Sequence, residues 1–348
     1  MTNAISTSTM SALTQMSVVR LQARLSKAQG ELASGRLADI GLTLGSQQGL
    51  SVSLRQTLDT LDAFSSSNVV VSARLGATQE ALTSIAATSS GVASSLLTAL
   101  STGTSATVLQ QIASQALSSV TGILNSSTGG AYLFGGENSS ARPLQPFDQT
   151  PPPAARQALV AAFQSAFGVA AGSPGAATIT PVQMQQFLDD QLAAQFNGAN
   201  WKANWSAADD HALQSQVSAS EVVASSVTAN EPAFRNMASA FSMLAGLGID
   251  TLNAETRKTV IATAERTLQA GAAGIAELQS SVGLAQKTVS DARDRTTRET
   301  SFLTSRVSDL ESVDPSQLAI EINALRTQLE TTYSLTAQLQ NLNLVKYL

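Results

Sequence analysis

The sequence predicts a mainly α-helical protein: an elongated, coiled-coil-like bundle of helices formed by its N- and C-terminal segments, with a small α+β domain inserted in the middle. Two long stretches, residues 1–142 and 233–314, contain no proline, the residue that most strongly breaks helices. Apolar residues in both recur at alternating spacings of three and four, which keeps them on one side of a helix. Eight of the ten Phe and both Trp lie between Phe134 and Phe241, as expected of a compact insert.

The N-terminal part is predicted to comprise an assembly helix, residues 1–45, and a helical rod, residues 46–142. The heptad rhythm begins with a set of small and apolar residues, namely Val18, Leu21, Leu25, Ala28 and Leu32. It continues through a longer set: Leu75, Thr78, Leu82, Ile85, Ser89, Val92, Leu96 and Ala99. A continuous helix over 50–100 would be about 75 Å long at 1.5 Å per residue. A break at the polar run Ser65–Asn68 is the alternative.

The C-terminal part is predicted to comprise a second rod segment, residues 231–315, and a C-terminal assembly helix, residues 316–348. Its stripe is formed by Leu278, Val282, Ala285, Val289 and Ala292, is interrupted at Thr296 and Glu299, and resumes at Leu303 and Leu310. Asp314-Pro315-Ser316 predicts a turn and a helix start, after which Leu318, Ile322, Leu325 and Leu329 continue the spacing. Three pairs four residues apart predict ion pairs on a solvated face: Asp291–Arg295, Asp294–Arg298 and Arg295–Glu299.

The middle segment, residues 143–230, is predicted to be a variable inserted domain. Residues 212–230 lack helical periodicity and carry Val clusters with partial alternation, which predicts one or two strands. Gly129-Gly130 and Gly135-Gly136 favour a turn or hairpin that ends a helix, because the spacing matches no phosphate-binding loop.

Composition argues against catalysis. There is no cysteine, and His211 is the only histidine, so thiolate sites and His-based triads are not expected. A binding cleft or a metal site is conceivable where Trp201 and Trp205 are followed by Asp209, Asp210 and His211. The favoured interpretation is that the Trp pair anchors a small domain. We therefore predict no catalytic, cofactor-binding or metal site, and no cofactor.

Charge and hydropathy also limit the partners. The net charge is −5 and the basic residues are scattered, so nucleic acid is not an expected partner. No apolar run approaches the ~18 residues of a membrane span, so a membrane is not expected either. The N-terminus lacks the basic and apolar regions of a cleaved signal peptide, so any export is expected to proceed without one.

Both ends of the chain carry a family resemblance. Residues 25–36, LSKAQGELASGR, resemble the N-terminal helix of bacterial flagellins and their junction relatives, which ends in a similar Ser-Gly-Lys/Arg turn. Residues 308–348, with their apolar last residues, are similar to the C-terminal helix of the same family. The resemblance covers about 5–140 and 231–348 and implies a structural, non-enzymatic subunit.

A further segment favours one branch of that family. Residues 130–144, GAYLFGGENSSARPL, are similar to the Tyr-Leu-Phe-x-Gly segment and following Pro of the hook-associated protein 3 group, which joins hook to filament. Residues 204–206 and 229–235 resemble its alphaproteobacterial form. The expected function is thus a hook–filament junction protein that polymerises through its paired terminal helices.

The resemblance also implies partners and a location. It implies ring assembly with copies of itself, contact with the other junction protein and with flagellin, and an export chaperone. It implies a flagellum-specific type III route to the extracellular hook–filament junction. The residues expected at the assembly interface are Leu13, Val18, Leu21, Leu25, Ala28, Leu32, Leu318, Ile322, Leu325, Leu329, Leu339, Leu342, Leu344 and Leu348.

Three alternatives stay open at the level of sequence. Flagellin, the main filament subunit, shares both ends and the fold. A coiled-coil signalling or adhesion protein would bind a ligand through the middle domain. An enzyme that uses His211 comes third.

Overall fold

The computed structural model describes residues 7–102 and 105–341. It divides into two compact units, residues 1–63 with 297–348 and residues 64–296, and the boundaries fall inside the helices α3 and α10. The fold is mainly α-helical, with long helices from both ends of the chain and two small two-stranded sheets, as the sequence predicts. The five-segment division drawn from proline placement stays a prediction.

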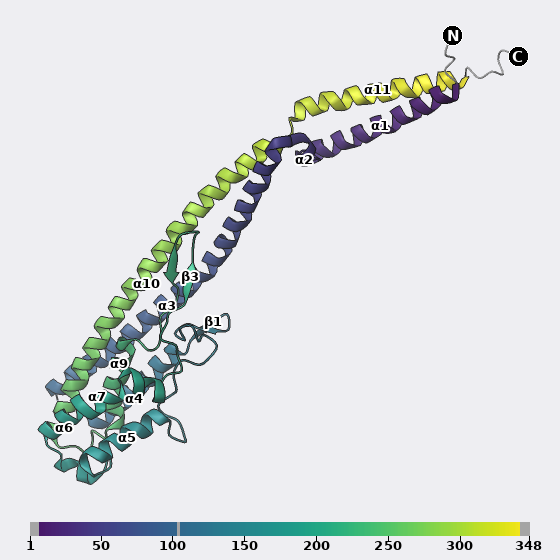
Figure 1. The fold of residues 1–348 in the computed structure, drawn as a ribbon. Helices are drawn as coiled ribbons and strands as arrows, with labels where there is room; N and C mark the ends of the chain where they lie inside the picture. The colour runs from purple at the N-terminus through teal and green to yellow at the C-terminus, as the bar shows by residue number, and fades with distance from the viewer. Residues whose placement is uncertain (1–6, 103–104, 342–348) are drawn as a thin grey trace. The chain divides into compact units, whose positions relative to one another are not determined.

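The first unit contains the terminal helices. It comprises α1 (Thr7–Ser34), α2 (Ile40–Leu44), the 3₁₀ turn η1 (Gly45–Gln47), the start of α3 (Gln48–Thr102), the end of α10 (Ala254–Glu311) and α11 (Pro315–Asn341). The helix α11 begins where the sequence predicts, because the Asp314 carboxylate accepts a hydrogen bond from the Ser316 amide at 2.8 Å. Figure 1 shows α1 and α11 side by side.

The second unit confirms the longer heptad set. All eight predicted positions of α3 are buried: Leu75, Thr78, Leu82, Ile85, Ser89, Val92, Leu96 and Ala99. The alternative of a break at Ser65–Asn68 is wrong, because α3 is continuous there. Asn68 is fully buried in the helix, and its side-chain amide donates to the Val217 carbonyl at 2.9 Å. A polar residue inside a stripe therefore marks a tertiary contact here, not a helix end.

The stripe of α10 differs from prediction at one position. Val282, Val289, Ala292 and Leu303 are buried as expected, and Leu278, Ala285 and Leu310 are half-buried. Thr296, which the sequence predicts to interrupt the stripe, is buried at 6% exposure, whereas Glu299 is exposed. Threonine carries a methyl group on its Cβ beside the hydroxyl, so it can occupy an apolar position of a helix stripe.

Two charged residues of α10 have partners other than those predicted. Asp291 accepts from Lys287 at 3.0 Å, and Arg295 pairs with Glu221 of the segment between β3 and β4. Helix spacing identified the charged face correctly, but another part of the unit supplies a partner for it.

Short strands and helices fill the rest of the second unit. After α4 (Ala106–Leu124), β1 (Ser127–Thr128) and β2 (Ala131–Tyr132) form the predicted hairpin. Gly129 and Gly130 have φ of +60° and +83°, which suits the two-residue turn between them. The predicted strands in 212–230 are confirmed as β3 (Gln214–Gln216) and β4 (Val222–Ala224), which pair antiparallel.

The remaining elements of the second unit are helical. They are α5 (Ala154–Phe167), η2 (Pro174–Thr178), α6 (Pro181–Phe187), the π-helical η3 (Leu188–Leu192), α7 (Ala193–Gln195), α8 (Gly198–Asn204) and α9 (Pro232–Gly246). A Cβ at Gly274 of α10 would lie 2.9 Å from the Ala233 Cβ, so α9 and α10 pack with almost no space between them. Such contact requires small residues on both helices.

Aromatic side chains form part of the core of the second unit. The Trp201 and Trp205 rings stack at 5.2 Å, and Phe147 stacks on Trp205 at 5.4 Å. Phe134 is fully buried and meets Phe234 edge to face at 5.6 Å. The Trp pair therefore belongs to the core of the second unit, as expected of residues that anchor a small domain. Within the described residues, no helix combines the length and apolarity needed to cross a membrane.

Candidate assembly interface

The two terminal helices meet along one apolar stripe. Ala28 of α1 is 3% exposed and clusters with the buried α11 residues Leu318, Ile322 and Leu325, with Leu21, Leu25 and Val313 packed around them. Ala28 contacts residues near the start of α11, whereas Gln22, which precedes it in α1, contacts Tyr333 further along α11. The two helices therefore run antiparallel. Six of the residues expected from the sequence thus come together: Leu21, Leu25, Ala28, Leu318, Ile322 and Leu325.

The other expected interface residues are less buried or lie outside the description. Val18 and Leu329 are half-buried, whereas Leu13 and Leu32 are 54% and 40% exposed. The side chain of Leu339 and the residues Leu342, Leu344 and Leu348 lie outside the described part of the chain.

Polar contacts flank the stripe. Arg24 bonds to the Glu321 carboxylate at 3.1 Å, and the side-chain amide of Gln22 donates to the Tyr333 hydroxyl at 2.7 Å. Both members of the ion pair are about half exposed, and such pairs contribute about 0–1 kcal/mol. These contacts therefore help to set the register of the two helices more than their stability.

The pair also exposes a second set of apolar side chains. On α1 these are Met10, Met16 and Val19, and on α11 they are Ile320, Tyr333 and Leu335, with exposures from 46% to 71%. Two packed helices cover only one stripe on each other, so among the described residues of the pair this second apolar set stays exposed.

A charged cluster lies at the base of the pair. We call it the Glu311 joint, and it consists of Glu311, Ser51, Arg55 and Arg36. Glu311 is fully buried; its carboxylate accepts from the Ser51 hydroxyl at 2.6 Å and from Arg55 Nε at 2.9 Å. Further bonds come from the guanidinium groups of Arg55 and Arg36. The Arg55 bond, followed by those of Ser51 and Arg36, lowers the pKa of Glu311 to about 2.

Backbone contacts complete the joint. The Leu37 amide donates to the Glu311 carbonyl at 2.9 Å, and the Val313 amide donates to the Gly35 carbonyl at 3.2 Å. Gly35 ends α1 with φ of +68°, and its amide bonds to the Glu31 carbonyl at 2.8 Å. The Ser-Gly-Arg turn noted in the sequence therefore stops α1 and delivers Arg36 to Glu311.

Sequence reasoning missed this joint, although a signal was present. Leu303, Val307 and Glu311 are four residues apart, so Glu311 occupies an apolar position of the α10 stripe. A carboxylate at such a position indicates a buried partner for its charge. The three partners cannot be read from the sequence, because they lie 256, 260 and 275 residues away along the chain.

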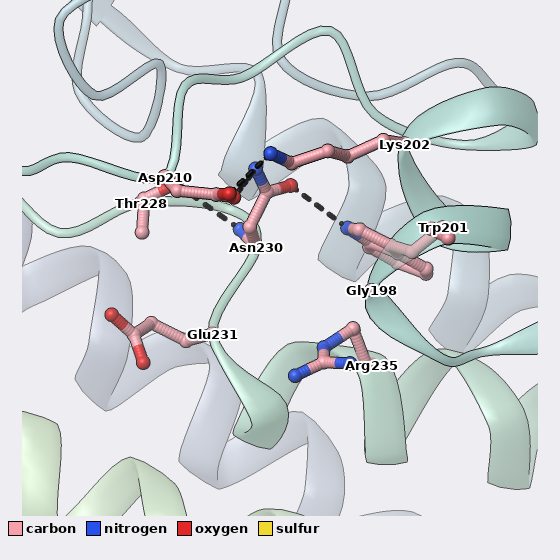
Figure 2. Close-up of a pocket in the computed structure, with 9 residues that line it drawn as sticks. Gly198, Trp201, Lys202, Asp210, Thr228, Asn230, Glu231 and Arg235 are labelled. Carbon is pink, nitrogen blue, oxygen red and sulfur yellow. Dashed lines mark hydrogen bonds and ion pairs between the residues drawn. The ribbon is translucent and has the colours of Figure 1, made fainter.

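The second unit contains a pocket of about 410 Å³. Figure 2 shows Lys202, Asp210 and Asn230 on one side of it and Glu231 and Arg235 on the other. The Lys202 bond lowers the pKa of Asp210, while burial raises the pKa of Glu231 against the opposing charge of Arg235. Two acidic and two basic side chains balance one another around the pocket, so it has no excess of positive charge for a polyanion. It lies where the sequence suggested a cleft.

Comparison with known proteins identifies the ends of the chain. The sequence-family model of the bacterial flagellin N-terminal helical region matches residues 5–139, and the family model of the flagellin C-terminal helical region matches residues 266–348. A solved structure, described as a flagellar hook-associated protein of Vibrio parahaemolyticus, aligns with a TM-score of 0.51 and 9% identity. The alignment covers 76% of this chain and 97% of that one and bears on the fold alone.

A search of curated proteins found no match. The two family models nevertheless cover both ends of the chain, including α1 and α11, and together more than half of its residues. The chain belongs to the flagellin family of structural flagellar proteins.

Proposed function

We propose that the chain is a subunit of the hook–filament junction and polymerises through its paired terminal helices. The observation that carries the proposal is the unequal burial of α1 and α11, where one stripe is buried within the pair and a second apolar set is exposed. Apolar side chains left exposed on both helices of a pair can form a contact surface for another subunit. In a subunit that polymerises, neighbouring copies supply the missing cover.

Energetics favour assembly that depends on a template. Burial of a Leu, Ile, Val or Met side chain contributes about 1.5–3 kcal/mol, while ordering each backbone residue costs about 1–2 kcal/mol. An isolated pair of helices is therefore marginal, and contacts from adjacent subunits stabilise it. Head-to-tail contacts between copies are heterologous, so they close into a ring or continue as a helical tube. The expected neighbours are copies of the chain, the other junction protein and flagellin.

Residues 130–144 support the junction role over the filament role. They resemble the corresponding segment of junction proteins, and Leu133 and Phe134 are buried in the core of the second unit. The main alternative is flagellin itself, because both roles fit a chain whose two ends match the flagellin family models. In both cases we expect the subunit in the extracellular flagellum, exported with the help of a chaperone, and without enzymatic activity.

Electron microscopy of appendages labelled with antibody against this chain tests the role. A junction protein gives one short labelled zone between hook and filament, whereas flagellin gives label along the filament. A strain that lacks the chain is expected to form hooks and to release unpolymerised flagellin into the medium. Label along whole filaments would establish the flagellin alternative.

A further inference from the structure

Three side chains that can bind metal ions lie together in the second unit. Glu137, Asp209 and His211 each offer a ligand atom, and these three atoms lie within 4.8 Å of one another. Glu137 follows the β1–β2 hairpin, and Asp209 and His211 follow α8, so the cluster joins two segments that are about 70 residues apart. Glu137 and His211 are exposed and Asp209 is half-buried, so an ion can enter from solvent.

The backbone holds the two segments tightly together. The Glu137 amide donates to the His211 carbonyl, and the Asp209 amide donates to the Gly135 carbonyl, both at 3.0 Å. Gly136 lies between them with φ of +62°, and a Cβ on it would lie 2.7 Å from the carbonyl oxygens of Asp209 and His211. Only glycine permits this approach, so the ligand-bearing backbone is positioned before any ion arrives.

This cluster differs from the sequence-based prediction, which takes Asp209, Asp210 and His211 together and expects no metal site. Asp210 stands between Asp209 and His211, but its carboxylate faces the pocket and bonds to Lys202 and to the Asn230 side chain (Figure 2). Asp209 instead bonds to the His211 ring at Nδ1, at 3.0 Å. The second carboxylate of the cluster is that of Glu137, which sequence spacing could not reveal.

We propose that Glu137, Asp209 and His211 bind a divalent transition-metal ion of the zinc or nickel type. One imidazole nitrogen with two carboxylate oxygens suits these ions, whereas calcium and magnesium favour oxygen ligands throughout. Bonds of about 2.0–2.2 Å place two ligands of one ion at most about 4.4 Å apart, so small side-chain rotations suffice. Water fills the remaining coordination positions, and the ion joins the segment after the hairpin to the turn after α8.

Calorimetry on the full-length chain without a purification tag tests the site, with zinc and nickel chlorides as probes. The wild type is expected to bind one ion. His211→Ala and Glu137→Gln are each expected to weaken binding by at least about tenfold, the lower range for loss of a group that supports a metal site. Asp210→Asn is the matched control and is expected to keep the wild-type affinity, because its carboxylate faces the pocket. The His211 side chain is 80% exposed, so its replacement leaves the core intact.

A second readout identifies the ligand directly. Since the chain has one histidine, its imidazole gives one set of NMR signals, and these are expected to shift on addition of zinc to the wild type. The proposal is overturned if the wild type binds neither ion at millimolar concentration, or if the imidazole signals stay unchanged. Equal affinity of wild type and His211→Ala, or equal weakening by Asp210→Asn, also overturns it.

Discussion

Replacement of Glu311 by Gln tests the Glu311 joint most directly. The substitution keeps the size of the side chain but removes the charge that Arg36 and Arg55 neutralise. A pKa lowered from 4.5 to about 2 corresponds to a stabilisation of roughly 3 kcal/mol, at about 1.36 kcal/mol for each pKa unit. The two arginine side chains are about half exposed and can turn to water, so the loss lies below that for a fully buried pair. We expect the local opening free energy to fall by about 2–3 kcal/mol.

Native-state amide exchange measures this loss. The Leu37 amide donates to the Glu311 carbonyl, and the Ser312 amide donates to the Ser308 carbonyl at the end of α10. Both amides are expected to exchange roughly 30- to 150-fold faster in Glu311→Gln, because a loss of about 2–3 kcal/mol in opening free energy corresponds to that ratio of exchange rates. The control is Glu321→Gln, which removes the exposed partner of Arg24 and is expected to cost less than about 1 kcal/mol. If the two variants exchange at the same rate, the joint does not stabilise the base of the pair.

The pH dependence provides an independent test of the same reasoning. The folded-state pKa of Glu311 lies below its ordinary value, so its contribution is fully present above about 4.5 and is lost as the pH falls towards about 2. Wild-type protection at Leu37, corrected for intrinsic exchange, is therefore expected to decline over this window. Glu311→Gln has no carboxyl group at this position, so the part of the decline in protection that comes from Glu311 is expected to be absent. A parallel decline in both proteins would contradict the assignment.

Three further predictions concern the helix pair and its connections. Ile322→Asp, at a buried position of α11, is expected to disrupt the helix pair and so to raise amide exchange in α1. Ile320→Asp, at a position 71% exposed, is expected to leave the monomer unchanged and to block assembly. Assembly of the Ile320→Asp variant would exclude this face as a subunit contact. Gly35→Ala is expected to cost about 1 kcal/mol in unfolding experiments, from the positive φ alone, because no atom lies within 4 Å of the added Cβ. Deletion of residues 316–348 is expected to leave the second unit folded by circular dichroism and to abolish incorporation into the flagellum; incorporation of the truncated chain would refute assembly through the terminal helices.

Local spacing in the sequence accounts for much of the fold. The eight stripe positions from Leu75 to Ala99 are buried as predicted, because residues spaced alternately three and four apart all lie on the same side of a helix. The hairpin at Gly129-Gly130 and the start of α11 after Asp314 follow from turn and capping chemistry within a few residues. Six of the apolar residues expected at the ends of the chain meet between α1 and α11, because each lies on the apolar stripe of its own helix.

Only the tertiary structure decided the polar contacts. The partners of Glu311 and the approach of Glu137 to His211 join segments far apart along the chain, and no local pattern specifies such pairs. Asn68 and Arg295 were misjudged for the same reason, since their partners lie near the β3–β4 hairpin. By itself the sequence determined which faces of the helices are apolar, because helical geometry repeats every few residues. Packing decided which charges meet, because a buried charge is stable only beside a partner that the folded chain supplies.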